Sequence, residues 1–211
     1  MKPIDAVIPW VDGNDPAQRQ RLETYLASLG RPRPRSADPT RFDDAGELAY
    51  CIASILRFAP WFRRIHVVTD RQTPALMSKF AGTAWAARVR VVDHREIFAG
   101  YEQCLPTFNS RAICAMLWRI SDIAERFVCF NDDFILLRRV EAQDFFRDDR
   151  VVLRGNWRRQ TAQSAWRNAI KRLRKSGSAS AAGNRQAQEH SARMMGFDDR
   201  YFGLYHVPYV Y

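Results

Sequence analysis

Two adjacent carboxylates in the sequence FNDDF, residues 130–134, are the side chains best suited to chemistry in this chain. Asp132 and Asp133 follow an apolar stretch typical of a buried strand, and Asn131 precedes them. Their oxygens are hard ligands that suit Mg²⁺ or Mn²⁺. A metal held there could bridge a diphosphate and neutralise charge that develops on a leaving phosphate. The alternative is an ordinary strand-end turn whose acids cap the next segment.

A second polar turn, WVDGNDP at residues 10–16, follows the first apolar run. Its residues with binding potential are Trp10, Asp12, Gly13, Asn14 and Asp15. Such a loop can hold the base, ribose or diphosphate of a nucleotide beside a sheet edge. Asp15 followed by Pro16 is also typical of a helix start, with Asp15 as the N-cap. Binding and capping therefore both remain open for this turn.

Two further positions carry residue types that bind phosphate. Arg41 could donate two parallel hydrogen bonds to a phosphate group. Asn109, Ser110 and Arg111 stand where a helix is predicted to begin, and the free N–H groups of a helix start favour an anion. Ordinary capping by Asn109 or Ser110 explains the same spacing equally well. His206, in YHVPYVY, is by its neighbours alone more typical of a packed side chain than of a catalytic one.

The elements that must position these residues alternate along the chain. Strands are predicted at residues 4–10, 65–69, 89–92 and 127–130, with helical segments between them. Each strand stops at a polar or acidic turn. The alternation predicts an α/β fold, an open, mostly parallel sheet with flanking helices. Because such sheets bind ligands outside the carboxyl ends of their strands, we expect the polar turns to meet at one site.

The charge of the chain is unevenly distributed. Of 211 residues 46% are hydrophobic, which is enough for a globular core. Residues 1–149 hold 21 Lys and Arg against 20 Asp and Glu, whereas residues 150–211 hold 12 against 3. The predicted organisation is an α/β catalytic core over residues 1–150, followed by a basic helical segment over residues 151–211.

Residues 157–175 are predicted to form an amphipathic basic helix that carries Trp157 and Trp166. Tryptophan among arginines suits an anionic membrane surface better than nucleic acid, and no recognised nucleic-acid module is present. A solvated helix face explains the pattern as well. The chain has no apolar run of membrane-spanning length and no secretory signal order at its start. The expected location is the cytoplasm, with or without peripheral contact at the inner membrane.

Several enzyme classes lack support in this sequence. It contains no GxSxG, no HExxH and no phosphate loop ending in GK[ST], so hydrolase triads and P-loop chemistry are not indicated. Its four cysteines form no CxxC pair, which gives no basis for a disulfide framework or a cysteine zinc site.

Taken together, the motifs resemble the Stealth family of hexose-1-phosphate transferases. The matching strings, in the family's order, are IDAVIPWVDGNDP, RFDDAGELAYCIASILRFAPWFRRIHVVTDRQ, HREIF, LPTFNSRAI and ERFVCFNDDFILL. They cover most of residues 4–146, and HVP at 206–208 resembles the start of a further family block. The resemblance implies a bacterial capsule, exopolysaccharide or lipopolysaccharide enzyme, related to the animal enzyme that adds N-acetylglucosamine phosphate to lysosomal glycans.

The resemblance also implies substrates and residue roles. The enzyme would move a sugar with its phosphate from a UDP-sugar donor to a hydroxyl of a glycan or lipid-linked glycan acceptor, releasing UMP. Asp132 and Asp133 would hold Mg²⁺ or Mn²⁺ and the diphosphate, and the turn at residues 10–16 would hold the nucleotide-sugar. His206 would be the general base, a role that suits a pKa near neutral. The residues that would line the phosphate pocket are Asn109, Ser110 and Arg111.

The sequence departs from the family pattern at two places. Many members carry an acid where this chain has Cys114, and they continue beyond the block that begins at His206 to further polar site residues. Whether these 211 residues hold the whole site is therefore open. Two other functions also stay open, a metal-dependent glycosyltransferase that releases UDP and a non-catalytic binder of anionic surfaces.

Overall fold

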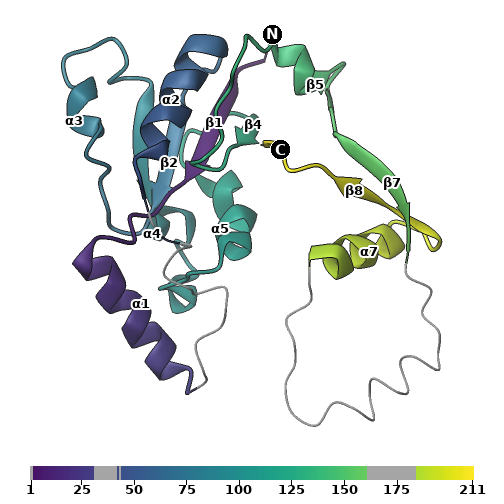
Figure 1. Cartoon of the computed structure of the whole chain (residues 1–211), viewed down its shortest axis with the longest axis horizontal. Coiled ribbons are helices and arrows are strands. Elements are labelled where there is room, and N and C mark those ends of the chain that lie inside the picture. The colour runs from purple at the N-terminus through teal and green to yellow at the C-terminus, as the bar shows by residue number, and fades with distance from the viewer. Residues whose placement is uncertain (1, 31–41, 43, 161–183) are drawn as a thin grey trace. The chain divides into compact units, whose positions relative to one another are not determined.

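The computed structural model describes residues 2–30, 42, 44–160 and 184–211 (Figure 1). These residues form two compact units, whose positions relative to one another are not defined. The first unit consists of Met1–Val152 and Pro208–Tyr211, and the second of Leu153–Val207. Arg41 lies outside the described residues, as does most of the segment 157–175.

A five-stranded sheet in the order β3-β2-β1-β4-β9 forms the centre of the first unit. Strands β1 to β4 run parallel to their neighbours, and β9 pairs antiparallel with β4. The bounds are β1 Ile4–Pro9, β2 Ile65–Thr69, β3 Val89–Asp93, β4 Arg126–Cys129 and β9 Tyr209–Val210. The predicted mostly parallel α/β sheet is thus confirmed. Its antiparallel edge strand, β9, comes from the aromatic end of the sequence.

The helices of the first unit that begin at Pro16 and Ser110 do so where the sequence predicted a helix start. The helices of this unit are α1 Pro16–Ser28, α2 Glu47–Phe58, α3 Met77–Phe80, α4 His94–Ile97 and α5 Ser110–Met116. Single 3₁₀ turns occupy Glu102–Cys104, Leu117–Arg119 and Ala142–Asp144, and a short hairpin joins β5 Phe146–Arg147 to β6 Arg150–Val151. Within the described ranges, none of the helices combines the length and apolar character needed to cross a bilayer.

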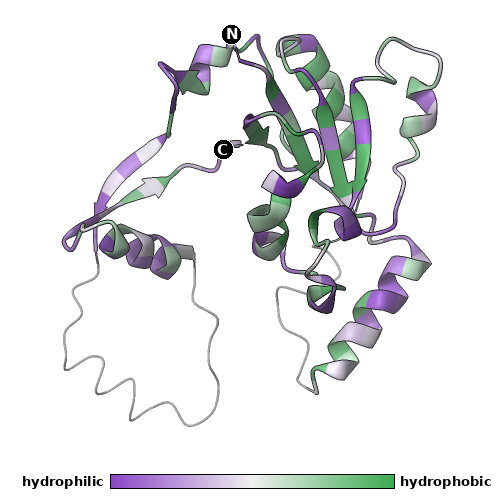
Figure 2. Ribbon diagram, turned by 180° about the vertical axis from the view of Figure 1, so that it is seen from behind, coloured by the Kyte–Doolittle hydropathy of each residue, from purple (hydrophilic) through white to green (hydrophobic). Residues whose placement is uncertain are grey.

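Both faces of the sheet are covered by apolar side chains, which explains why β1 and β2 are apolar almost throughout. Ala6 and Ile8 point to the side of α2, whose residues Leu48, Cys51, Ile52 and Ile55 are buried against them. Val7 points to the other side, where it packs with Ile97 and Leu117. Figure 2 shows the strands as largely hydrophobic ribbons between helices of mixed character.

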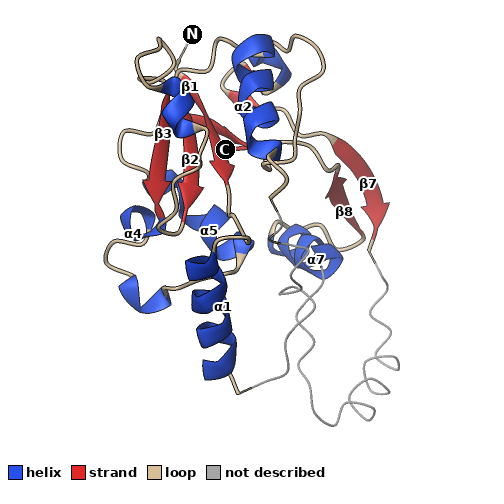
Figure 3. Cartoon of the chain, turned by 60° about the vertical axis from the view of Figure 1, so that its left-hand side comes forward, coloured by secondary structure: helices blue, strands red, loops and turns tan. Residues whose placement is uncertain are grey.

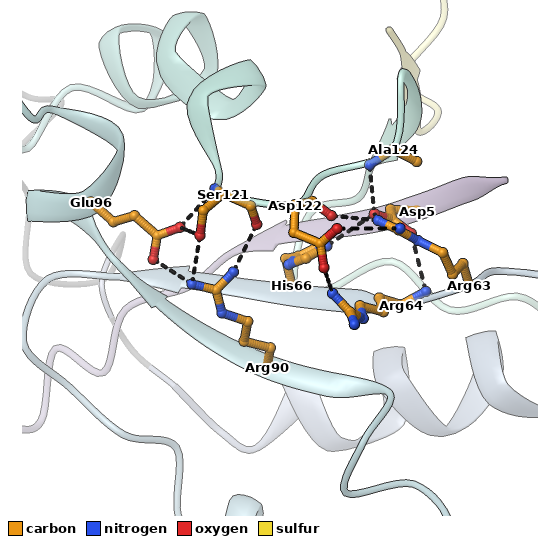
Figure 4. A network of polar contacts seen from close by, with 9 residues as sticks. All are labelled: Asp5, Arg63, Arg64, His66, Arg90, Glu96, Ser121, Asp122 and Ala124. Carbon is orange, nitrogen blue, oxygen red and sulfur yellow. Dashed lines mark hydrogen bonds and ion pairs between the residues drawn. The ribbon is translucent and has the colours of Figure 1, made fainter.

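A buried ionic network closes the end of the sheet where β1 and β2 begin (Figure 4). Asp5 is fully buried and accepts two hydrogen bonds from the guanidinium of Arg63, at 2.9 and 2.6 Å. It also accepts one from the Ala124 N–H at 2.8 Å and lies 3.1 Å from Nε2 of His66. Burial alone would raise the pKa of Asp5, but the hydrogen bonds from His66, Arg63 and Ala124 outweigh it and hold the pKa far below its usual range.

The second unit contains a two-stranded ribbon and one helix. Strand β7, Gly155–Arg159, pairs antiparallel with β8, Arg200–Leu204, and the helix is α7, Asn184–Met194. Helix α7 falls within the segment, residues 151–211, that was predicted to be helical. The basic helix predicted from residue 157 is wrong at its start, because residues 157–159 belong to β7. Tryptophan followed by arginines is compatible with a solvent-exposed ribbon as well as with an amphipathic helix, so periodicity alone could not distinguish strand from helix here.

Candidate active site

The strand order places the candidate site at the carboxyl ends of β1 and β4. Strand β1 has β2 on one side and β4 on the other, so the direction in which strands are added reverses between β1 and β4. This is the switch point at which open α/β sheets form a ligand crevice. The strand arrowheads in Figure 3 point towards α1, α4 and α5, which surround that end of the sheet.

A cavity of about 320 Å³ lies at this position. Its walls come from the ends of several strands and from the segments that follow them. The lining residues that bear most on function are Trp10, Phe42, Asp70, His94, Ser110 and Asp132. The cavity therefore brings together three of the predicted site residues, Trp10, Ser110 and Asp132, which are far apart in the sequence.

Asp132 lies in a surplus of negative charge. Burial raises its pKa to about 6, and the neighbouring carboxylates of Asp133, Asp44 and Glu47 add to the shift. The negative charge also acts on Cys51, whose Sγ lies 3.6 Å from the carbonyl oxygen of Asn131. Burial and then Asp132 and Asp133 raise the pKa of this thiol to about 12. Asp133 itself is exposed and lies outside the cavity lining, so Asp132 is the better placed of the two acids.

The turn after β1 is held in shape by its own polar residues. Asp15 caps α1, because its Oδ1 accepts the Ala17 N–H at 2.9 Å, while its Oδ2 accepts a hydrogen bond from Gln72 Nε2 at 2.9 Å. These bonds, that from Gln72 foremost, lower the pKa of Asp15. The Asp12 Oδ1 accepts the Asn14 N–H at 2.7 Å. Asp12, Asn14 and Asp15 do not line the cavity, and their direct contact with a nucleotide stays a prediction.

Gly13 has a steric reason to be glycine. A Cβ atom at this position would lie 2.2 Å from the carbonyl oxygen of Phe42, to which the Gly13 N–H donates a 2.6 Å hydrogen bond. The close approach lets Phe42 reach the cavity wall. Trp10 strengthens the same junction, since its Nε1 donates a 3.2 Å hydrogen bond to Oδ2 of Asp44. The turn thus positions Trp10 and Phe42 in the cavity wall.

Of the three predicted residues at the start of α5, one lines the cavity and another caps the helix. Asn109 is the N-cap, with its Oδ1 accepting the Arg111 N–H at 3.0 Å. Ser110 lines the cavity, whereas Arg111 is exposed and does not. Ordinary capping therefore accounts for Asn109. Cys114, one turn further along α5, also lines the cavity.

Three other lining residues, His94, Asp70 and Gln18, were not among the predicted site residues, although the place of His94 after the third predicted strand left lining the site or capping a helix open. His94 is 5% exposed, its Nδ1 has no hydrogen-bond partner among the described residues, and burial lowers its pKa, which favours the neutral imidazole. The Nε of Arg21 donates a 3.1 Å hydrogen bond to Oδ2 of Asp70. Gln18 lies on α1, and no sequence pattern marks it as a cavity residue. The position of Asp70 and His94 at the ends of β2 and β3 was the available signal.

His206 belongs to the second unit, where it is exposed just after β8. Because the placement of that unit relative to the cavity is not defined, its role as general base stays a prediction.

The carboxylate of Asp132 suits a divalent cation whose coordination is completed by a bound ligand. Within the described part of the chain, no three His, Cys, Asp or Glu side chains are grouped so as to hold a metal by themselves. Mg²⁺ is commonly bound by one or two carboxylates together with substrate phosphates. Asp132, a carboxylate whose ionisation is opposed by its acidic neighbours, is suited to that arrangement, because a cation would relieve the repulsion.

Two segments of this chain are similar in sequence to a known protein family. Residues 2–30 match the family model of Stealth protein conserved region 1, and residues 41–153 match that of conserved region 2. The chain is 39% identical over 155 residues to a capsular polysaccharide phosphotransferase of Aeromonas hydrophila, with 71% of this chain and 40% of the relative covered. It is 46% identical over 144 residues to an exopolysaccharide phosphotransferase of Streptomyces coelicolor, covering 68% and 25% of the two chains.

A third relative, a capsular polysaccharide phosphotransferase of Actinobacillus suis, is 36% identical over 150 residues, with 71% and 39% covered. This chain thus spans two fifths or less of the length of these three relatives. The resemblance seen in the sequence motifs is confirmed. Because the model of conserved region 2 alone matches more than half of its residues, the chain belongs to the Stealth protein family.

Proposed function

We propose that this chain carries the donor-binding part of a phosphotransferase of polysaccharide biosynthesis. The reaction would move a sugar 1-phosphate from a UDP-sugar to a hydroxyl of a glycan or lipid-linked glycan, with release of UMP. The names of the relatives support the reaction class, and the finer assignment rests on the chemistry of the cavity.

The observation that carries the proposal is Asp132 at the cavity wall with its pKa raised to about 6. Ionising a partly buried carboxylate that has three acidic neighbours is costly unless a cation joins it. When bound, Mg²⁺ or Mn²⁺ would neutralise charge on the diphosphate and on the leaving UMP. Asp132 would hold that ion, and Asp133 would support it from the exposed side.

The aromatic and polar walls suit the remainder of the donor. Trp10, Phe42 and Phe108 offer apolar surface for a nucleoside, and Ser110 offers a hydroxyl at the start of α5. His94, whose Nδ1 has no hydrogen-bond partner among the described residues, adds a polar group to the same wall. The cavity has the apolar lining with few polar groups that is typical of small-molecule sites.

In the proposed step, the acceptor hydroxyl oxygen attacks the β-phosphorus of the UDP-sugar. A new P–O bond forms, the bond from the β-phosphorus to the bridging oxygen breaks, and UMP leaves with that oxygen. The hydroxyl proton passes to a base, the role proposed for His206. Arg41 would add positive charge at the phosphate.

The test is identification of the nucleotide released. The purified chain is incubated with UDP-sugars, Mn²⁺ and glycan acceptors, and nucleotides are separated by chromatography. We expect UMP, with the rate reduced about 100-fold or more by Asp132→Asn. The matched control is Asp148→Asn, an exposed acid at φ +46, a conformation that Asn tolerates. Release of UDP would contradict phosphotransfer and favour a glycosyltransferase, and equal rates in both variants would contradict the role of Asp132.

A further inference from the structure

The β7–β8 ribbon of the second unit exposes a run of side chains that the donor site does not use. Residues 156–159 on β7 are all exposed. Trp157 and Arg159 lie two residues apart and therefore share a face of the ribbon. Their partners in the antiparallel register, Phe202 and Arg200, lie on that same face.

Arg159 and Arg200 stand directly opposite each other across this ribbon. Like charges at such a pair destabilise a sheet unless something compensates them. Both side chains are exposed, and neither forms an ion pair with an acid within the described residues, although Asp198 and Asp199 precede Arg200. The pair presents two guanidinium groups whose repulsion a bound anion would relieve, and guanidinium groups bind phosphate oxygens bidentately.

An aromatic surface adjoins the arginine pair. The guanidinium carbon of Arg200 lies 4.8 Å from the centroid of the Trp157 ring, and Phe197 and Phe202 pack against that ring at 5.3 and 5.4 Å. Even so, Trp157 remains 52% exposed. Along the strand, Trp157 and Arg159 are about 7 Å apart, comparable with one sugar ring and its phosphate.

We infer that this face, formed by Trp157, Arg159 and Arg200, binds a phosphodiester group of a glycan chain, with a neighbouring sugar against the tryptophan. The inference rests on the proposed function, because phosphodiester-linked sugars are what that reaction makes. The second unit would then hold the acceptor or product strand, and the excess of basic residues after residue 150 would match the negative charge of that strand.

A second cross-strand arginine pair in the chain serves as an internal comparison. Arg147 and Arg150 face each other in the β5–β6 hairpin and are also exposed. Their turn holds Asp148 and Asp149, and the Arg147 side chain donates to the carbonyl oxygen of Gln143. Replacing Arg147 and Arg150 removes as much positive charge as replacing Arg159 and Arg200, but from another strand pair.

The test is binding of a phosphodiester glycan to the full chain without donor or metal. The probe is a hexamer of N-acetylglucosamine 1-phosphate, titrated calorimetrically at low and moderate salt. We expect Arg159→Gln with Arg200→Gln to weaken binding about tenfold or more, and Arg147→Gln with Arg150→Gln to change it less than about twofold. Arg159→Gln alone, which removes no ion pair or ring contact with any described residue, should weaken binding about fivefold and guards against an effect of misfolding.

Neutral chitohexaose, phosphatidylglycerol vesicles and oligothymidylate are the comparison ligands. Tighter binding of vesicles or oligothymidylate than of the glycan phosphate would overturn the inference, as would equal weakening by the two arginine pairs. Asp132→Asn should leave this binding intact. If the unsubstituted chain binds the glycan but releases no UMP, only the proposed function is overturned; if it releases UMP but does not bind the glycan, only this inference is overturned.

Discussion

The indole of Trp10 and the carboxylate of Asp44 meet at 3.2 Å, joining the turn after β1 to the residues before α2. The same carboxylate is close enough to Asp132 to contribute to its raised pKa. One wall of the cavity and the charge of its acidic centre are therefore linked through Asp44.

The first prediction concerns the pH dependence of metal binding. Because a proton and a cation compete for Asp132, Mn²⁺ affinity should fall as the pH drops below about 6. Asp44→Asn removes one of the neighbouring charges that raise the pKa of Asp132, so the midpoint should move to lower pH. Mn²⁺ titrations between pH 5 and 8 would measure it. A midpoint unchanged in Asp44→Asn, with Asp148→Asn as the control, would show that Asp44 does not act on this carboxylate.

The second prediction is that Asp132→Asn stabilises the fold. The pKa of Asp132 is raised from its ordinary value of 3.8 to about 6 in the folded chain, so ionisation of this carboxyl costs stability as the pH rises between these values. Asn cannot ionise. The free energy of unfolding in urea at pH 7.5 should increase by about 1–2 kcal/mol, a figure reduced for the partial solvent access of this side chain. At pH 4 the gain should vanish, and a gain that persists there would indicate another cause.

The third prediction concerns the buried network in Figure 4. Asp5→Asn leaves the Arg63 guanidinium without its carboxylate and should lower the free energy of unfolding by about 2–4 kcal/mol at pH 7. The pKa of Asp5 is held below its unfolded value, so its stabilisation is present above about pH 4 and is lost as the pH falls further. The wild type should therefore approach the variant in stability at pH 2–3. Urea denaturation across this range decides, and a constant difference would contradict the argument.

The fourth prediction separates a steric clash from backbone strain. Gly13→Ala should push Phe42 away from the turn, because its Cβ would meet the Phe42 oxygen at 2.2 Å. The affinity for the donor, measured by titration with a UDP-sugar, should fall about tenfold. Gly82→Ala is the control, since at φ +73 it has open space and brings only conformational strain of about 1 kcal/mol. Similar losses of affinity in both variants would assign the effect to general destabilisation.

The location of the site was predictable from sequence because strand ends are set locally. Apolar runs that stop at Asp12, Asp70, Asp93 and Asn131 mark carboxyl ends of strands, and parallel pairing brings those ends together. Which polar side chain enters the cavity could not be read in the same way. Asp15 and Asn109 have the residue types of ligands but cap helices, a choice made by turn geometry.

The remaining differences have similar causes. Gln18 reaches the cavity only through the packing of α1, which no local pattern encodes. Residues 157–159 form a ribbon because β8, forty residues later, supplies their hydrogen-bond partners. Long-range pairing of this kind overrides a helical pattern over a few residues.

The measurement that tests the account most directly is Mn²⁺ binding followed by electron paramagnetic resonance, with and without a UDP-sugar. We expect weak Mn²⁺ binding by the chain alone and binding at least about tenfold tighter with the UDP-sugar, because Asp132 and the diphosphate would share the ion. In Asp132→Asn that enhancement should disappear, and in Asp148→Asn it should remain. Enhancement retained in Asp132→Asn would contradict the assignment of the metal and diphosphate to the end of β4.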